Sequence, residues 1–336
     1  MKKIIFTILT MCSALGLVWA DEPECPPAAT STTTVSFIRV KPSVFEARFK
    51  VGDSKYVVFT RGNLQYNARY NSWRMAEHQY DVIRDTDGNY TAAGRDEQDA
   101  WIDLFGWGTS GFNRTSVDNY SIHYQPWEVS SVNIGETTNY YGYGPSTSVL
   151  GYGENLSRLD ATKNYDWGVY NFVAGEEAGC RVLTKDEWVY LFSTRKGYRD
   201  LYSYGTLFGI DGIFLLPDDW TWSGVVATAA TAADFEWTAA STDFTKNVIV
   251  SNDNGRALWN AMEDAGAVFL PSGGWRGTDN TKHYETGGRG LYWSSTAGNN
   301  NQTAYSIYYY EGKFQADYPA QRCTGINIRL VKDVTP

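Results

Sequence analysis

The sequence predicts an α+β protein in which short strands and long loops surround two main helices. Trp, Tyr and Phe number 13, 24 and 15, beside 32 Gly, and this surplus favours strands, turns and loops over a helical bundle. Short apolar runs that end at Gly or Pro recur along the chain, as in small twisted antiparallel sheets. Two segments carry clear helix signals, so we expect two helices packed on such sheets.

Charge and composition exclude several classes of protein. The chain has 38 Asp and Glu against 29 Lys and Arg, a formal charge of −9. A generic nucleic-acid binder needs a basic stripe, but the longest basic run here is Lys2-Lys3. A disordered chain is poor in aromatic residues and rich in charge, unlike this one. With three His in all, a catalytic or metal site built from histidines is hard to assemble.

Four apolar runs are expected to form strands. Residues 56–59 (Tyr-Val-Val-Phe) end at Arg61-Gly62-Asn63. Residues 213–216 and 267–270 are each followed by a proline, Pro217 and Pro271, which cannot continue a central strand. In the last run Ile326, Ile328 and Leu330 alternate with Asn327 and Arg329, the period of a half-buried strand.

The two main helices have distinct start and stop signals. Thr184 and Glu187 fit a capping box, in which each side chain satisfies an exposed amide of the other residue. Its apolar face would be Trp188, Leu191 and Phe192. The second helix is predicted from about Asp253 to Asp264, with Ala257, Leu258, Ala261 and Met262 inward and Gly266 beyond its end. Residues 99–105 could form a third, short helix.

The N-terminus has the pattern of an export signal. Lys2 and Lys3 precede an apolar run, and a small residue, Ala20, precedes Asp21, so residues 1–20 are predicted to be a signal peptide. The run is shorter than the roughly 20 residues that span a bilayer, so no membrane-spanning segment is expected. Lipidation at Cys12 is a less favoured alternative. Residues 21–44, rich in Pro, Ser and Thr, are predicted to be a linker, and residues 45–336 one domain.

Export permits disulfides. Without residues 1–20 the chain keeps Cys25, Cys180 and Cys323, so at least one thiol has no partner within the chain. Cys25 lies in the Pro-rich tail, whereas Cys180 and Cys323 each precede a well-patterned segment. We therefore predict a disulfide between Cys180 and Cys323.

A succession of motifs resembles a known family. Along residues 45–335 the chain resembles the Fibrobacter succinogenes major paralogous domain family of secreted Bacteroidetes proteins. Each motif is weak by itself, and their common order gives the resemblance its specificity. The motifs are Gly62-Asn63-Leu64-Gln65-Tyr66, Asp103-Leu104-Phe105-Gly106-Trp107-Gly108-Thr109-Ser110-Gly111, Asp166-Trp167-Gly168-Val169-Tyr170-Asn171, Leu183-Thr184-Lys185-Asp186-Glu187-Trp188, Leu216-Pro217-Asp218-Asp219-Trp220, Ala267-Val268-Phe269-Leu270-Pro271, Tyr292-Trp293-Ser294-Ser295 and Ile328-Arg329-Leu330-Val331.

The resemblance implies a C-type-lectin-like fold related to the formylglycine-generating enzymes. In that group an Arg-Leu-Pro-Thr-x-x-Glu-Trp segment opens a helix, and residues 181–188 are similar, with Leu183 in place of the proline. The enzymes of that group use a cysteine pair near the C-terminus, where this chain has Cys323. Relatives that form sulfoxides bind iron through three histidines, but His78, His123 and His283 lack ligand spacing. We therefore expect no enzymatic activity and no cofactor.

Two acidic patterns have both functional and ordinary interpretations. Residues 85–89 (Asp-Thr-Asp-Gly-Asn) offer oxygen ligands at alternating positions, as calcium loops do, although a solvated turn is the favoured interpretation. The adjacent pairs Asp218-Asp219 and Glu176-Glu177 could serve glycoside hydrolysis, which needs two opposed acids. Adjacent residues do not face each other, so surface or capping roles are expected.

The C-terminal segment is the strongest candidate for a binding surface. Residues 278–327 contain 5 Asn, 7 Tyr, 3 Ser, 6 Thr and 2 Asp, the residue types that antibody paratopes use. Tyr292, Trp293 and Tyr305 are expected in the core. This pattern also resembles the variable region of diversity-generating retroelement target proteins, which share the C-type-lectin-like fold and in which these residue types accumulate at exposed positions.

These observations predict a secreted or cell-surface, non-enzymatic protein that binds an extracellular glycan or protein through its C-terminal loops. The alternatives are an enzyme, either formylglycine-generating or carbohydrate-active, and a structural component of a surface fibre. The sequence leaves the oligomeric state open. The predicted ligand-binding residues are Trp275, Asp279, His283, Tyr284, Asn299, Asn300, Asn301, Gln302, Tyr308 and Tyr310.

Overall fold

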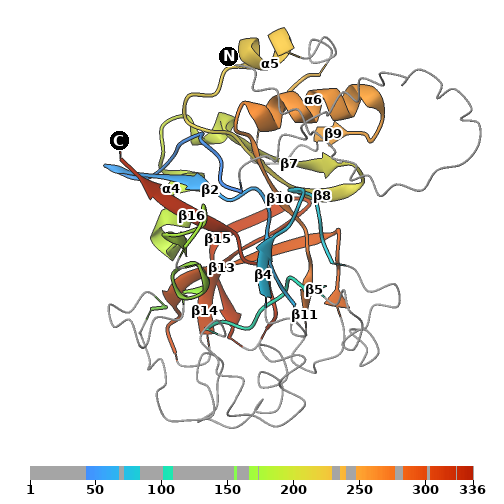
Figure 1. Ribbon diagram of the computed structural model, residues 1–336. Coiled ribbons are helices and arrows are strands. Elements are labelled where there is room, and N and C mark those ends of the chain that lie inside the picture. Colours follow the sequence, from blue (N-terminus) through green and yellow to red (C-terminus); the bar gives the residue numbers. More distant parts are fainter. Residues whose placement is uncertain are drawn as a thin grey trace, which may run out of the picture. The chain divides into compact units, whose positions relative to one another are not determined.

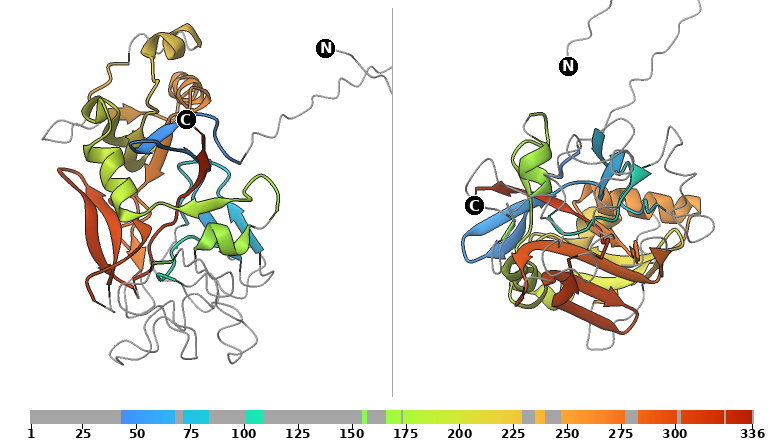
Figure 2. Two further views of the ribbon diagram at one scale, coloured as in Figure 1. Left: turned by 90° about the vertical axis from the view of Figure 1, so that its left-hand side faces the viewer. Right: turned by 90° about the horizontal axis from the view of Figure 1, so that it is seen from below.

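The computed structural model describes residues 43–67, 72–83, 101–108, 155–156, 166–172, 174–228, 235–239, 247–276, 283–300, 303–322 and 324–335. The chain divides into two units, Met1–Val40 and Lys41–Pro336. Every described residue belongs to the second unit, and Figures 1 and 2 draw the described residues in colour. The predicted signal peptide and nearly all of the predicted linker lie outside the described residues.

The fold is α+β, as predicted, with most described elements in small antiparallel sheets. The first sheet has the order β1-β2-β16-β6, so strands from the two ends of the domain pair side by side. Its strands are β1 (Phe49–Gly52), β2 (Lys55–Phe59), β16 (Leu330–Val334) and β6 (Cys180–Val182). Strand β2 confirms the strand predicted at residues 56–59.

The second sheet has the order β10-β8-β7-β9, in which only the described pair β7 and β9 is parallel. Its strands are β7 (Tyr202–Leu207), β8 (Ile210–Leu215), β9 (Asn247–Ile249) and β10 (Val268–Pro271). They confirm the strands predicted near residues 213–216 and 267–270, although Pro271 is the last residue of β10 rather than the first beyond it. Helix α6 (Asp253–Asp264) shares an apolar cluster with this sheet.

The third sheet is the hairpin series β13-β14-β15, which lies beside helix α4 (Lys185–Ser193) in Figure 2. Smaller sheets of order β4-β3-β5 and β11-β12 complete the described strands. The bounds are β13 (Arg289–Ala297), β14 (Thr303–Tyr310), β15 (Lys313–Gln321), β3 (Leu64–Asn67), β4 (Ser72–Met75), β5 (Trp101–Ile102), β11 (Trp275–Arg276) and β12 (His283–Tyr284); short helices are α3 (Trp167–Asn171), α5 (Trp222–Thr228) and a 3-10 turn at Tyr198–Asp200.

Helix α4 confirms its sequence prediction in detail. The Thr184 hydroxyl accepts the Glu187 amide at 3.2 Å, and the Glu187 carboxylate accepts the Thr184 amide at 2.9 Å. Trp188, Leu191 and Phe192 are buried. Arg181 then donates to both Glu187 and Asp333, so one guanidinium joins β6, the start of α4 and β16.

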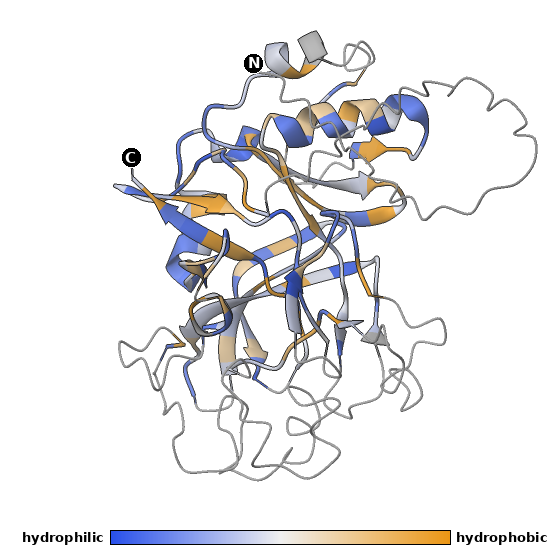
Figure 3. Cartoon of the chain, viewed as in Figure 1, coloured by the Kyte–Doolittle hydropathy of each residue, from blue (hydrophilic) through white to orange (hydrophobic). Residues whose placement is uncertain are grey.

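Helix α6 has the predicted bounds but not the whole predicted face. Leu258 and Met262 are buried as expected, whereas Ala257 is exposed. Positions three and four apart share one face of a helix, and the buried face is centred on Leu258, Trp259 and Met262, which turns Ala257 toward solvent. Figure 3 shows hydrophilic and hydrophobic bands alternating along this helix.

Two sequence predictions are wrong. The described part of residues 99–105 contains strand β5, which pairs with β3, and no helix. At the C-terminus, Asn327 and Arg329 are as fully buried as Ile326 and Ile328, and β16 begins only at Leu330. The alternating apolar pattern therefore marks a segment enclosed on both sides rather than a half-buried strand.

Arg329 is buried completely and donates to four oxygens from distant parts of the chain. Its guanidinium reaches the Asn63 side-chain oxygen at 3.0 Å and the Phe269 carbonyl at 2.6 Å. It also reaches the carbonyls of Thr60 and Arg61 at 2.9 and 2.7 Å. Burial lowers the pKa of Arg329 to about 10, so the group stays charged at neutral pH.

Replacing Arg329 is expected to destabilise the domain strongly. Arg329→Met leaves buried carbonyls without a donor, and should lower the free energy of unfolding by about 3 kcal/mol or more. Arg329→Lys keeps a charge but not the planar fork, so its loss should be intermediate. The exposed Arg199→Met is the control, and urea unfolding is the measurement. A loss at Arg329 no greater than at Arg199 would contradict this interpretation.

Asp166 is fully buried and joins α3 to β6. One carboxylate oxygen accepts the Gly168 amide at 3.0 Å, and the other accepts the Val182 amide at 3.0 Å. Burial raises the pKa of Asp166 to about 6, against the opposing effect of these hydrogen bonds. Between about pH 4 and 6 the folded state therefore binds more protons at this site than the unfolded state, and its stabilising contribution falls as pH rises.

The variant Asp166→Asn should remove this pH dependence while keeping an oxygen that accepts from the Gly168 and Val182 amides. The unfolding free energy of the variant minus that of the wild type should therefore rise by about 2 to 3 kcal/mol as the pH increases from about 4 to 7. Urea unfolding across that range measures the difference. A stability difference that stays constant with pH would show that the carboxyl group titrates equally in both states.

Candidate ligand-binding surface

Cationic and aromatic side chains form rows across one face of the β13-β14-β15 sheet. Arg289 pairs with Tyr310, and Tyr310 pairs with Lys313. Directly paired residues in an antiparallel sheet project from the same face, so these three form one row. In the next two rows of this face stand Leu291, Tyr308 and Gln315, then Trp293, Ser306 and Tyr318.

Arg289 lies among three rings. Its guanidinium carbon is 5.0 Å from the ring centroid of Tyr310, 5.9 Å from that of Tyr308 and 5.5 Å from that of Trp275. A cation within about 6 Å of an aromatic centroid is attracted to it, by about 0.5 to 1 kcal/mol when exposed. The arginine thereby connects the sheet to the β11-β12 hairpin.

The hairpin holds Trp275 and Tyr284 as a stacked pair, with ring centroids 5.5 Å apart and planes 18° apart. Gly274 precedes this pair with φ 72°, and a β-carbon there would lie 2.2 Å from the Tyr284 carbonyl oxygen. Its amide donates to the Arg289 carbonyl at 2.8 Å. The sequence therefore needs glycine at 274 to bring the hairpin against the start of β13.

Tyr308 and Tyr318 form a second stacked pair, with centroids 4.8 Å apart. The Lys313 amine lies 5.5 Å from the Tyr308 centroid and 6.0 Å from that of Tyr310. We call the whole cluster the aromatic patch. It consists of Trp275, Tyr284, Arg289, Tyr308, Tyr310, Lys313 and Tyr318.

The patch is supported from behind and open in front. Trp275, Tyr308 and Tyr318 are half-buried and pack against the core cluster that contains Leu291 and Trp293. The remaining members of the patch are half-buried or exposed. Because the rings already contact one another, little side-chain freedom is left to lose when a ligand binds.

Charge on the patch is mixed. Glu285 forms an ion pair with Arg289, and Glu285 adopts φ 54°, the left-handed region that non-glycine residues seldom occupy. Burial raises the pKa of Tyr308, and Arg289 opposes that shift. The patch therefore offers neutral phenols, an indole and two cations, which suits hydrogen bonding and ring contact more than the binding of a highly charged ligand.

The sequence-predicted site divides into two regions. Trp275, Tyr284, Tyr308 and Tyr310 meet in the aromatic patch. Asn299 and Asn300 are exposed in the turn between β13 and β14, beyond Ala297, and β13 extends roughly 26 Å from Arg289 to Ala297. Asp279, Asn301 and Gln302 lie outside the described residues; His283 stands opposite Arg276 in the hairpin, and its side chain is not described.

Of the three residues expected in the core, Tyr292 and Trp293 are buried and Tyr305 is half-buried. Tyr305 belongs to the asparagine end of the sheet, where its hydroxyl donates to the Asn299 side chain at 2.8 Å. Lys185 lies 4.9 Å from its ring centroid. Among the residues that the structure describes, this end of the sheet is therefore polar and lacks the ring cluster of the other end.

Sequence analysis missed Arg289, Lys313 and Tyr318. The two residues between Tyr310 and Lys313, Glu311 and Gly312, are typical of a tight hairpin, and Gly312 indeed has φ 82°. That turn predicts that Tyr310 and Lys313 pair, which would have placed the lysine beside the tyrosines. Arg289 and Tyr318 have no comparable local signal, because their neighbours come from separate strands.

The predicted disulfide stays a prediction. Cys180 is a buried free thiol whose pKa is raised by burial to about 11, and Cys323 lies outside the described residues. The acidic segment at residues 85–89 also lies outside them. Within the described part of the chain, no three His, Cys, Asp or Glu side chains gather closely enough to hold a metal ion.

Comparison with protein-family models, with curated proteins and with solved structures finds no match to this chain. Among the helices formed by described residues, none combines the length and the apolar character needed to cross a bilayer.

Proposed function

We propose that this protein is a secreted or cell-surface binding protein without enzymatic activity, and that the aromatic patch is its ligand-binding surface. The observation that carries the proposal is the convergence of Trp275, Tyr284, Tyr308 and Tyr310 around Arg289. These residues come from two separate sheets, and four of the five are among the ligand-binding residues predicted from the sequence. The ligand is an extracellular glycan or protein.

The chemistry of the patch supports recognition rather than catalysis. Tyr, Trp and Arg are the residue types that contribute most to binding energy at interfaces, and Tyr and Trp combine an apolar ring with a polar edge. Acid-base catalysis needs titratable groups with perturbed pKa values that converge in a cleft. On this patch the carboxylate of Glu285 is paired with Arg289, which supports a binding role.

We also propose that the domain has a C-type-lectin-like fold of the Fibrobacter succinogenes major paralogous type. The capped helix at Thr184, the terminal strand β16 beside β2, and the small sheets with long connections support it. In the variable proteins of diversity-generating retroelements, which share that fold, exposed C-terminal residues vary. The half-exposed Tyr308 and Tyr310 would suit such a surface. A near-copy of the final coding segment beside a reverse-transcriptase gene would test this part of the proposal.

Alanine variants test the patch directly. A glycan array and an array of extracellular proteins, probed with the purified protein, would supply ligands, and calorimetry would give their affinities. Trp275→Ala and Tyr284→Ala should each weaken binding by about tenfold or more, because truncating a central aromatic residue commonly costs over 1 kcal/mol. The same losses of affinity are expected whether or not the protein is lipidated or part of a surface fibre.

The opposite end of the sheet provides matched controls. Tyr305→Ala removes an equally half-buried tyrosine and Asn300→Ala removes a polar turn residue, and neither should change affinity by more than about twofold. Unchanged binding in Trp275→Ala and Tyr284→Ala would sink the assignment. Losses confined to Tyr305→Ala and Asn300→Ala would move the site to the asparagine turn.

A further inference from the structure

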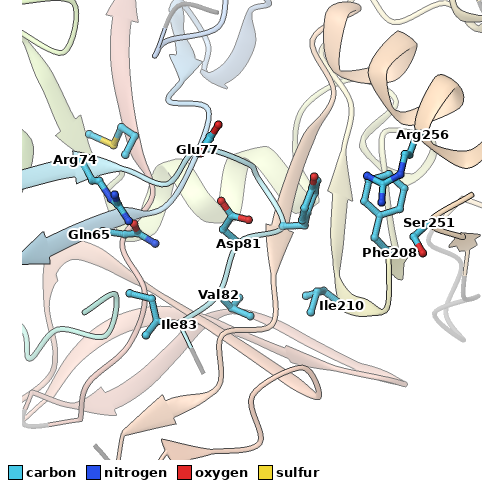
Figure 4. A pocket seen from close by; sticks show the side chains of 12 residues that line it. Gln65, Arg74, Glu77, Asp81, Val82, Ile83, Phe208, Ile210, Ser251 and Arg256 are labelled. Atoms are coloured by element: carbon cyan, nitrogen blue, oxygen red, sulfur yellow. The ribbon is translucent and has the colours of Figure 1, made fainter. Parts of the chain in front are cut away.

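A cavity separate from the aromatic patch opens between three segments, namely the loop after β4, the turn between β7 and β8, and the first turns of α6. Its volume is about 690 Å³, within the usual range for small-ligand sites. Figure 4 shows the side chains that line it. No residue of the aromatic patch contributes to this lining.

The loop that forms one wall is held rigidly. Gln79 is fully buried, and its side chain donates to the Ala267 carbonyl at 3.0 Å and accepts the Phe269 amide at 2.8 Å. The Ile83 amide donates to the Asp103 carboxylate at 2.9 Å. The described part of the loop is thus bound to the core at two points, Gln79 and Ile83.

Charged side chains line the cavity on both sides. The end nearest β4 carries Arg74, Glu77 and Asp81, one cation and two carboxylates. The other end carries Arg256 from α6. In Figure 4 Arg74 and Arg256 lie on opposite sides, with the Asp81 carboxylate between them. Arg256 interacts through a side-chain hydrogen bond with Tyr80, which also lines the cavity.

The charged groups are held in place by contacts that leave them facing the cavity. The Arg256 guanidinium lies 5.2 Å from the ring centroid of Phe208. Asp81 accepts the His78 amide at 2.8 Å through one oxygen. Four apolar side chains also line the cavity: Val82, Ile83, Phe208 and Ile210.

We propose that this cavity binds short peptides by their free ends. The ammonium group would lie at Asp81 and Glu77, the carboxylate at Arg256, and apolar side chains along Phe208 and Ile210. An end with two carboxylates and one cation, a second end with Arg256, and an apolar lining match a zwitterion whose charges stand several bonds apart. A peptide extends about 3.5 Å per residue, so two or three residues suit a cavity of this size better than a single amino acid.

Calorimetry on the full protein with tripeptides of Ala, Leu and Phe tests the proposal. Each peptide is compared with its N-acetylated form, its C-amidated form and free leucine. We expect the free peptide to bind and each blocked form to bind about tenfold more weakly, because a charge-assisted contact is lost. Leucine should also bind more weakly than the peptide.

Two charge-neutralising variants assign each end. Asp81→Asn keeps an oxygen that accepts from the His78 amide. This variant should bind free and N-acetylated peptides with equal affinity, and should still bind C-amidated peptides more weakly. Arg256→Gln should bind free and C-amidated peptides with equal affinity, and should still bind N-acetylated peptides more weakly. Arg199→Gln, an exposed arginine away from the cavity, and Trp275→Ala, in the aromatic patch, should bind the peptides as the wild type does.

Several results would overturn the proposal. They are no measurable binding of any free peptide at millimolar concentration, equal affinity for free and blocked peptides, and unaltered discrimination in both variants. Stronger binding of leucine than of any tripeptide would replace the peptide with a single amino acid. The outcome is independent of the aromatic patch, because Trp275→Ala should affect glycan or protein binding and leave peptide binding unchanged.

Discussion

Three consecutive carbonyls at the end of β10 organise the interior. The Phe269 carbonyl accepts from Arg329, that of Leu270 from the Tyr309 hydroxyl, and that of Pro271 from the Tyr292 hydroxyl. All three donors are buried. A buried carbonyl without a donor costs about 1 to 3 kcal/mol, so the backbone of β10 requires these side chains. The strands that supply them, β13 and β14, and the segment before β16 are thereby fixed against the second sheet.

The aromatic patch depends on the same arrangement. In β14, Tyr309 points to the core cluster that faces β10, and its neighbours Tyr308 and Tyr310 therefore point to the other face. Tyr292 and Trp293 are both buried because β13 separates two core clusters. The sheet packs against core clusters on both faces of β13, and the tyrosines and Arg289 gather at the end where β13 begins.

Local chemistry explains which features the sequence predicted. The helix caps at Thr184 and Asn252 each involve residues within four positions of one another, so the helix starts could be predicted from the sequence. The burial of Arg329 could not be predicted in this way, because its four acceptors lie 60 to 269 residues away along the chain. An alternation of apolar and polar residues implies a solvated face unless a distant partner satisfies the polar side chains. In the patch, composition identified the tyrosines but could not identify Arg289, whose neighbours come from the hairpin and β14.

The two proposed sites place different demands on the same framework. The patch relies on rings that already stack on one another, so its affinity depends on fixed shape and responds weakly to salt. The cavity relies on charges held apart by its walls, so peptide binding there should weaken as ionic strength rises. Its wall is tied to the centre of the fold through Phe269, whose amide donates to Gln79 while its carbonyl accepts from Arg329. A conservative change at Arg329 that leaves the protein folded should therefore disturb the cavity wall through Phe269, the residue that carries both hydrogen bonds.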